Sequence, residues 1–203
     1  METTLVLGSS SPQRLKLLHS ANILPDIVEG ADIQEIQRPK ETARTFSQRM
    51  AIEKAMSLSS KYPHFWILSG DTVVCRGTQI LQKPEDAATA YHYLSLLSGR
   101  RHLVTSSIAL ISPKFRKPKI RSVTTRIKFK TLTEQEKKEY VLTEEWKGKS
   151  GGYALQGRAA AFILWLNGSY TSVIGLPLPE TLAMLYGSGW LNGRNKEPVK
   201  TET

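Results

Sequence analysis

Two segments in the middle of the chain have the pattern of long strands, and together they restrict the fold more than any other feature. Residues 102–111 (HLVTSSIALI) and 121–131 (RSVTTRIKFKT) combine period-two alternation with a high content of β-branched side chains. The basic stretch 114–119 (KFRKPK) lies between them and is predicted to form a hairpin loop. Since the chain also contains helical segments without a strict strand–helix–strand alternation, an α/β fold with a mixed sheet is expected.

The other predicted elements fit one domain. Apolar runs predict strands at 5–7, 65–74 and 160–166, and helical spacing or capping residues predict helices at 12–20, 41–60, 84–97, 133–142 and 179–186. The strand at 65–74 contains a polar stretch that fits either a turn or a sheet edge. Because no repeat or long linker interrupts this order, residues 1–192 are predicted to form a single domain. The polar segment 193–203 is predicted to be a disordered basic tail.

Composition excludes several classes of protein. Cys75 is the only cysteine, so an internal disulfide is excluded and a protein of the reducing cytoplasm is expected. No apolar run reaches the length of about 18 residues that a membrane span requires, so no contact with a membrane is expected. The four histidines are scattered, and a bound metal would therefore need oxygen ligands.

The net charge of +10 leaves more than one interpretation open. Lysine and arginine side chains attract phosphate groups, but a basic total also arises from an ordinary solvated surface. No interleaving of aromatic and basic residues accompanies the charge, so a stable complex with nucleic acid is not expected.

The stretch 8–14 (GSSSPQR) follows the first predicted strand and begins the first predicted helix. A helix start offers free N–H groups and a partial positive charge, and three serine hydroxyls and Arg14 add further donors for a phosphate. The alternative is a plain capped helix on the surface, with Ser11 as the cap and Pro12 in the first turn. Neither common nucleotide-binding glycine motif is present, so the stretch alone does not decide between these readings.

Four further residues carry charge in positions that fit a phosphate or metal site. Asp71 lies amid apolar residues in the predicted strand 65–74, where an unpaired carboxylate would be costly. Asp71 could have a structural role, as a hydrogen-bonded turn residue. Alternatively it could have a functional role, as a metal ligand or a general base. Lys83 precedes Pro84, which directs its side chain from a loop. The local sequence around Lys54, on a predicted helix, and around Glu35, in a predicted loop, does not by itself indicate a functional role for either residue.

A glycine-flanked amide is the last candidate. In the stretch 149–157 (KSGGYALQG), glycines surround Gln156, as they would if the loop had to bring this side chain against a flat ligand. Glutamine can read the edge of a base with a paired donor and acceptor. A flexible surface loop with a structural glutamine explains the same pattern.

The order of these stretches resembles the Maf family of nucleoside triphosphate pyrophosphatases over about residues 4 to 190. The matching pieces, in order, are SSSPQR, the Glu35 loop, EKA, SGDTVV, LQKP, LSGRRH, GYALQG and NGSYTSVIGLPLPET. One such piece would be weak, but eight in the right order and spacing are specific. SSSPQR corresponds to the phosphate loop S-x-S-P-R-R of that family.

This resemblance implies an elongated mixed α/β molecule of the inosine-triphosphatase-like (Maf/Ham) fold, with two lobes around a central cleft and a homodimeric assembly. The implied reaction is hydrolysis between the α and β phosphates of a nucleoside triphosphate, which gives a monophosphate and pyrophosphate with Mg²⁺ or Mn²⁺ as cofactor. Asp71 matches the proton acceptor of the family, and Glu35 and Asp71 are the expected metal ligands. The positions expected to bind phosphate are Ser9, Arg14, Lys54 and Lys83.

The resemblance also bears on the choice of substrate. Thr72 and Gln156 match specificity positions of the subgroup that acts on dTTP and UTP, whereas Gln13 stands where that subgroup has an arginine. Two of the three positions are therefore kept, and a pyrimidine triphosphate is expected. Because Gln13 carries no charge, a broader range of substrates or action on 7-methyl-GTP stays an alternative. A non-catalytic regulator that binds nucleotides or nucleic acid is the alternative from another class of protein.

Overall fold

The computed structural model describes residues 4–190, apart from the side chain of Arg116. A seven-stranded mixed sheet forms its centre, in the order β2-β1-β3-β5-β6-β7, with β4 pairing β3 separately. The strands are β1 Leu5–Gly8, β2 Ile27–Val28, β3 Trp66–Arg76, β4 Gln79–Leu81, β5 Arg101–Ser112, β6 Phe115–Phe129 and β7 Ile163–Asn167. Strand β1 runs parallel to β2 and β3, and the other pairs are antiparallel, so the predicted mixed sheet is confirmed.

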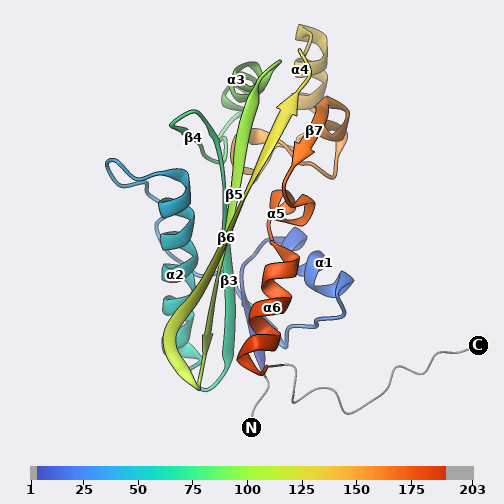
Figure 1. The fold of residues 1–203 in the computed structure, drawn as a ribbon. Helices are drawn as coiled ribbons and strands as arrows, with labels where there is room; N and C mark the ends of the chain where they lie inside the picture. Colours follow the sequence, from blue (N-terminus) through green and yellow to red (C-terminus); the bar gives the residue numbers. More distant parts are fainter. Residues whose placement is uncertain (1–3, 191–203) are drawn as a thin grey trace, which may run out of the picture.

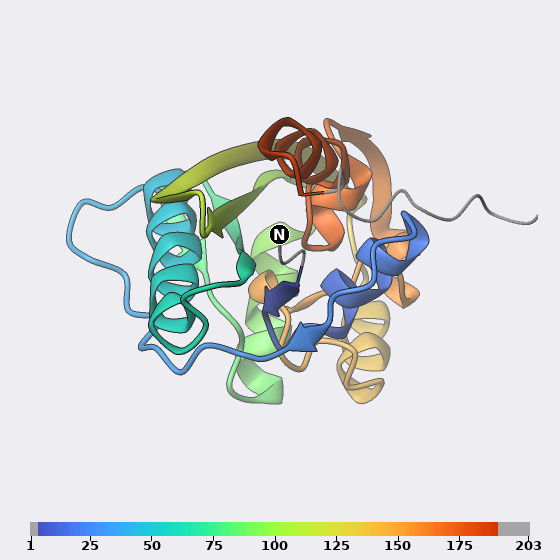
Figure 2. The ribbon, with the colours of Figure 1, turned by 90° about the horizontal axis from the view of Figure 1, so that it is seen from below.

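Helices cover both faces of the sheet (Figures 1 and 2). They are α1 Pro12–Ser20, α2 Ala43–Lys61, α3 Ala87–Leu97, α4 Glu134–Leu142, α5 Tyr170–Ile174 and α6 Leu178–Ser188, with short 3₁₀ helices at Ser150–Gly152 and Arg158–Phe162. Helix α2 packs on one face, while α1 and α6 lie on the other (Figure 2). No helix within residues 4–190 is both long enough and apolar enough to cross a bilayer.

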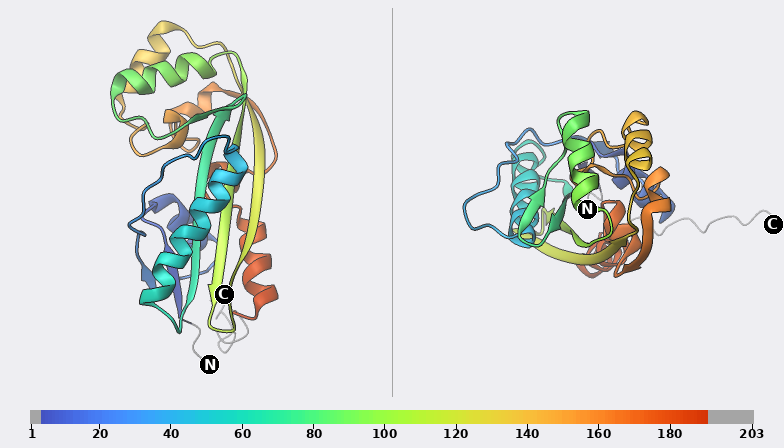
Figure 3. Two further views of the ribbon diagram at one scale, coloured as in Figure 1. Left: turned by 90° about the vertical axis from the view of Figure 1, so that its left-hand side faces the viewer. Right: turned by 90° about the horizontal axis from the view of Figure 1, so that it is seen from above.

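The molecule is elongated because β5 and β6 run along its whole length (Figures 1 and 3). Helices α3 and α4 lie at one end, and α1, α2 and α6 surround the other end. The core is divided in the same way. One apolar cluster, which includes Leu94, Phe129 and Tyr140, fills the end with α3 and α4. A second cluster, which includes Leu7, Leu68 and Leu185, joins α1 and α6 to the sheet at the other end.

The predicted hairpin loop at 114–119 is wrong, because Ser112 already pairs with Phe115 and all of this stretch except Lys114 belongs to β6. The turn between β5 and β6 is therefore confined to two residues. Proline is normally excluded from a central strand, but Pro118 lies where β6 pairs only with β5. Phe115 packs edge-on against Trp66, which fixes the start of β6 over the sheet.

The other boundaries follow local chemistry. Helix α3 begins at Ala87 rather than at Pro84, since the side chain of Asp86 caps it by accepting from Thr89 N–H. The capping box predicted at Thr133 and Glu136 is present at the start of α4. Helix α6 ends at Ser188, beyond the predicted end, and Gly189 closes it in the left-handed conformation. The predicted tail at 193–203 lies outside the described residues.

A gap in the sheet edge decides where the molecule can bind a ligand. Strand β1 pairs with β3 only as far as Ser69, and β4 begins to pair with β3 at Val74. Between these points, the stretch 70–73 has a strand partner on one side only, which is β5. The polar break predicted in this strand is therefore an edge and not a turn. Side chains from both faces of β3 can reach the same space around this open edge.

Candidate active site

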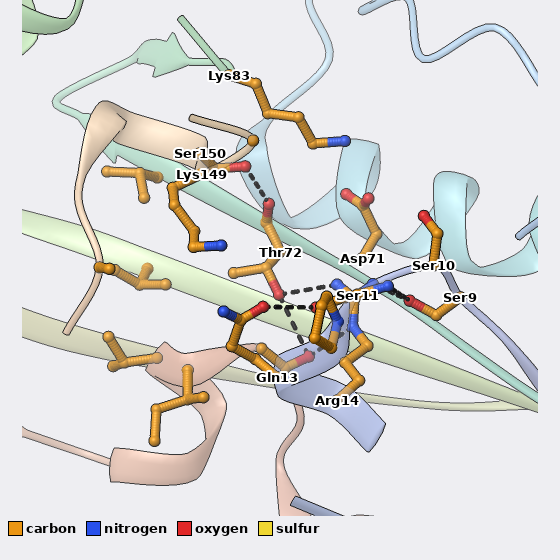
Figure 4. A pocket seen from close by; sticks show the side chains of 18 of the residues that line it. Ser9, Ser10, Ser11, Gln13, Arg14, Asp71, Thr72, Lys83, Lys149 and Ser150 are labelled. Carbon is orange, nitrogen blue, oxygen red and sulfur yellow. Dashed lines mark hydrogen bonds between the residues drawn. The ribbon is translucent and has the colours of Figure 1, made fainter. Parts of the chain in front are cut away.

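A pocket of about 450 Å³ opens at this gap. Its lining comes from the start of α1, the loop before α2, the edge of β3, the loop after β4, the 147–156 loop and the turn after α5. Side chains in Figure 4 point into it from several of these elements. All of the predicted site residues line it: Ser9, Gln13, Arg14, Glu35, Lys54, Asp71, Thr72, Lys83 and Gln156. The structure thus brings together residues that are up to 147 positions apart in the chain.

Asp71 and Thr72 enter the pocket from opposite faces of β3. Because successive side chains of a strand alternate, Asp71 points toward α2, and Thr72 points toward α1 and the turn after α5. An ordinary sheet would separate these two side chains by a paired neighbouring strand. No strand pairs with this edge of β3, so the Asp71 carboxylate and the Thr72 hydroxyl can contact the same ligand.

The end of the pocket near α2 is charged. Lys54 Nζ lies 2.8 Å from Asp71 Oδ1 and 3.0 Å from Glu35 Oε1, and Lys83 Nζ lies 3.4 Å from Glu35 Oε2. Lys54 and Asp71 are both buried, whereas Lys83 is exposed. Partial burial opposes the ionisation of Glu35, but the two lysines outweigh it and hold the pKa of this carboxyl below its usual value. Two acidic and two basic side chains are thus gathered around one point.

This donor set fits a divalent cation that is completed by its ligand. Glu35 and Asp71 supply hard carboxylate oxygens, which Mg²⁺ and Mn²⁺ prefer. Within residues 4–190, no group of three or more His, Cys, Asp or Glu side chains is close enough to hold a metal without help. Phosphate and water oxygens would have to complete the coordination, as is usual for Mg²⁺ at nucleotides.

The start of α1 keeps its N–H groups available. Ser11 occupies the N-cap position but makes no side-chain cap, and its hydroxyl instead donates to Gln13 Oε1 at 3.3 Å. Pro12 at the next position has no N–H to satisfy. The predicted capping role of Ser11 is therefore wrong, and the positive end of a nine-residue helix faces the pocket without a competing cap.

Arg14 acts as a clamp within the protein. Its Nε donates to Gly175 O at 2.8 Å, its Nη1 to Ser9 Oγ at 2.9 Å, and its Nη2 to Thr72 Oγ1 at 3.2 Å. Burial lowers the pKa of Arg14, against the attraction of Asp71 and Glu35. Only part of the guanidinium is left for a ligand, so Arg14 ties the serine loop to β3 and to the turn after α5.

The other end of the pocket is neutral apart from the lysines of the 147–156 loop. Val74, Val104 and Val173 line it together with Tyr153, and Gln156 is exposed at its rim. Gly151 explains how the 147–156 loop comes so close to the sheet. Its φ is +73°, and a Cβ atom at this position would lie 2.8 Å from side-chain atoms of Val74.

Two residues from this loop, Lys149 and Ser150, were not singled out from the sequence. The side chain of Lys149 is half-buried, points into the pocket (Figure 4) and forms no hydrogen bond or ion pair within residues 4–190. Burial lowers its pKa. Ser150 Oγ donates to Thr72 O at 2.8 Å and so satisfies a carbonyl of the open strand edge. The unpaired ammonium of Lys149 indicates that this loop contacts a ligand. It can be recognised only in the folded chain, because the sequence does not show which side chains lack a partner.

Behind this end, His102 and Tyr153 form a buried pair. His102 Nε2 lies 2.8 Å from Tyr153 Oη, and both rings pack edge-on against Phe129. Burial lowers the pKa of His102 to about 4, so the imidazole stays neutral near pH 7. Tyr153 is held in place by this contact, and it forms a fixed wall of the pocket.

Comparison with known proteins agrees with this geometry. The family model described as "Maf-like protein" matches residues 4–188. A dTTP/UTP pyrophosphatase of Rhodospirillum rubrum is 48% identical over 191 residues, which cover 94% of this chain and 90% of the relative. A second dTTP/UTP pyrophosphatase, from Caulobacter vibrioides, is 46% identical over 186 residues, with 92% and 96% covered.

A solved structure supports the fold independently. The structure of a HAM1 protein from Coxiella burnetii superposes with a TM-score of 0.51 at 14% sequence identity, and the match covers 91% of this chain and 98% of that one. At this identity the likeness concerns the fold alone, and it confirms the predicted Maf/Ham class. With the family model matched over nearly all described residues and relatives close to half identical, the chain belongs to the Maf-like protein family.

Proposed function

We propose that this protein is a nucleoside triphosphate pyrophosphatase that hydrolyses the bond between the α and β phosphates, with dTTP and UTP as substrates. One observation carries the proposal: a single pocket joins a charged end, built on Asp71, Glu35 and two lysines, to a neutral end with Thr72 and Gln156. The names of the relatives from R. rubrum and C. vibrioides support the same activity and the same substrates.

The charge distribution orients the substrate. A triphosphate brings about four negative charges, which Lys54, Lys83 and the start of α1 can offset. The base has no charge and suits the neutral end, where Thr72 and Gln156 offer hydrogen bonds. Ser9 and Arg14 lie between the two ends, since the Arg14 side chain bonds both Ser9 and Thr72. Gln13 lines the same part of the pocket.

Asp71 is the group suited to accept a proton from the attacking water. When the water oxygen bonds to phosphorus, its proton passes to a carboxylate oxygen of Asp71, the P–O bond to the leaving phosphate breaks, and pyrophosphate departs. Lys54 holds Asp71 Oδ1 and fixes the orientation of the carboxylate. Lys54 and Lys83 also face the negative charge that develops on the phosphate oxygens.

Glu35 and Asp71 would hold the divalent cation, Mg²⁺ or Mn²⁺. When bound, such a cation neutralises phosphate charge and lowers the pKa of a coordinated water. Glu35 is suited to this role because its loop is anchored close by: Arg49 Nη2 donates to Ile36 O at 2.8 Å, and the same guanidinium pairs with Glu41.

A panel of triphosphates tests the proposal. The purified protein is incubated with Mg²⁺ or Mn²⁺ and with dTTP, UTP, dCTP, dATP, dGTP and 7-methyl-GTP, and the products are separated by chromatography. We expect monophosphate and pyrophosphate, with dTTP and UTP turned over fastest. Release of inorganic phosphate with a diphosphate would contradict the position of cleavage. Preference for 7-methyl-GTP would move the protein to another substrate class.

Three further features belong to the proposal. Residues 1–192 form one catalytic unit, the assembly is a homodimer, and the enzyme works in the cytoplasm. The match of the family model over 4–188 supports the single unit. Light scattering of the purified protein measures the mass directly, and a value for one chain of 22.7 kDa would contradict the dimer.

A further inference from the structure

A chain of hydroxyl groups runs from the pocket into the protein through Thr72. Ser106 Oγ lies 2.6 Å from the backbone oxygen of Ser172 and 2.7 Å from Thr72 Oγ1. A carbonyl oxygen cannot donate, so the single hydroxyl hydrogen of Ser106 must point to Ser172 O. Two oxygens 2.7 Å apart also need a hydrogen between them. Thr72 therefore donates its own hydrogen to Ser106.

The other contacts of Thr72 agree with this direction. Arg14 Nη2 donates to Thr72 Oγ1 at 3.2 Å and occupies one of its lone pairs. Gly175 O lies farther away, at 3.4 Å, and already accepts from Arg14 Nε. Turning the Thr72 hydrogen to Gly175 O would leave no hydrogen in the 2.7 Å contact between Thr72 and Ser106, so Ser106 is the acceptor. Thr72 Oγ1 then has one lone pair left for the pocket and no donor.

The 2.6 Å contact prevents this network from reversing. Ser172 O also accepts from Gly175 N–H at 3.1 Å, but a carbonyl has no hydrogen to place between itself and Ser106 Oγ, so Ser106 must supply it. The Arg14 guanidinium can only donate, and it is held by three bonds. Thr72 is ordinarily able to donate or to accept, but here it is locked as an acceptor.

We propose that Ser106 is a specificity-positioning residue, which makes Thr72 a one-way acceptor for a ring N–H of the substrate base. This inference rests on the proposed function, because it assumes that the base lies at the neutral end of the pocket. Uracil and thymine carry a hydrogen on N3, which Thr72 Oγ1 can accept. Cytosine has a bare N3 lone pair at the same position, so it would meet another lone pair.

Lys149 strengthens the same discrimination. It precedes Ser150, which bonds the backbone of Thr72, and its unpaired ammonium points into the pocket near the Thr72 side chain (Figure 4). An ammonium can only donate. The O4 carbonyl of uracil or thymine accepts such a bond, whereas the N4 amino group of cytosine is a donor. An acceptor next to a donor thus matches one pyrimidine pattern and opposes the other.

The test compares dTTP with dCTP, because the two bases have similar size and differ mainly in this pattern. We expect Ser106→Ala to free the Thr72 hydroxyl and to lower the ratio of kcat/KM for dTTP over dCTP by about tenfold, mainly through a gain with dCTP. Ser107→Ala is the matched control. Ser107 is the next residue and equally buried, but its hydroxyl bonds Ser47 and Ser122 on the opposite face.

The outcomes separate a specific role from a structural one. A merely structural Ser106 would lower both kcat/KM values together and leave their ratio unchanged, and this result would overturn the inference. Thr72→Val provides a second test, in which the same ratio of kcat/KM values is measured with and without Ser106→Ala. If Ser106 acts through Thr72, the double variant should show the same ratio as Thr72→Val alone, and additive effects on the ratio would contradict the inference.

A binding measurement separates this inference from the proposed function. If the wild-type protein hydrolyses none of the triphosphates, the proposed function fails. The affinity for dTTP and dCTP, measured by calorimetry on wild type and Ser106→Ala, then decides the inference alone. A ratio of the two affinities that falls in the variant supports it, and an unchanged ratio overturns it.

Discussion

Lys54 Nζ lies 2.8 Å from Asp71 Oδ1, and both side chains are buried at the edge of the sheet. A buried ion pair contributes little net stability, because the loss of hydration offsets most of the attraction. The Lys54–Asp71 pair instead serves to position the carboxylate of Asp71. The lysine comes from α2 and the carboxylate from β3, so their contact holds the proposed base at a fixed distance from the loop that carries Glu35.

Asp71→Asn tests the proposed base. The amide keeps nearly the same shape and can still accept from Lys54, but it cannot take up a proton. We expect kcat to fall by about 10²- to 10⁴-fold, while nucleotide binding is largely retained. Pyrophosphate release and equilibrium binding are the two measurements. The control is Asp32→Asn, an exposed aspartate outside the pocket lining. Near-normal turnover by Asp71→Asn would remove Asp71 from the chemistry.

Gln13→Arg tests the departure from the pattern of the dTTP/UTP subgroup. Gln13 lines the pocket and accepts from Ser11, so an arginine here would add a positive charge beside the substrate. A charged donor strengthens a hydrogen bond by about 1 kcal/mol, and we therefore expect kcat/KM for dTTP or UTP to rise about fivefold. Gln135→Arg on α4 adds the same charge on an exposed helix away from the pocket. Unchanged or lower values would mean that position 13 does not limit the reaction.

Lys149→Met tests the unpaired ammonium. Since the side chain of Lys149 has no hydrogen-bond or ion-pair partner within the described part of the chain, its replacement should leave the free energy of unfolding within about 0.5 kcal/mol of wild type. We expect KM for dTTP to rise about tenfold, because one donor to the substrate is lost. Lys138→Met on α4 serves as the comparison. A KM equal to that of wild type would show that Lys149 does not contact substrate.

Acid stability tests the Glu41–Arg49 contact behind the Glu35 loop. Two hydrogen bonds from Arg49 are the main reason that the pKa of Glu41 is lowered to about 2, and partial burial opposes them. A depressed carboxyl pKa stabilises the fold above its unfolded value and loses that contribution as the pH falls. Wild type should therefore lose about 1–2 kcal/mol between pH 5 and pH 2 that Glu41→Gln does not lose.

Urea unfolding at several pH values measures this difference. Glu85→Gln, at an exposed position outside the Glu41–Arg49 contact, should follow the wild-type curve. Parallel curves for wild type and Glu41→Gln would contradict the assigned role of the Arg49 contact.

Much of the fold was predictable because its signals are local. The strand at 5–7, the helix after Pro12 and the capping box at Thr133 depend on alternation, helical spacing and caps within a few residues. The basic stretch 114–119 misled for the same reason. Its composition is typical of a loop, but long-range pairing with β5 on one side and an unpaired edge on the other make it a strand.

The sequence by itself determined most of the longer elements, the family and the nine candidate site residues, since motif order and residue type are written along the chain. The tertiary structure alone decided how those residues meet. The sheet edge between Ser69 and Val74 stays open because β1 ends before β4 begins, and this opening lets Asp71 and Thr72 reach one pocket from opposite faces. The direction of the Thr72 hydroxyl and the free ammonium of Lys149 depend on neighbours far away in sequence, because hydrogen-bond partners are set by the packing of distant segments.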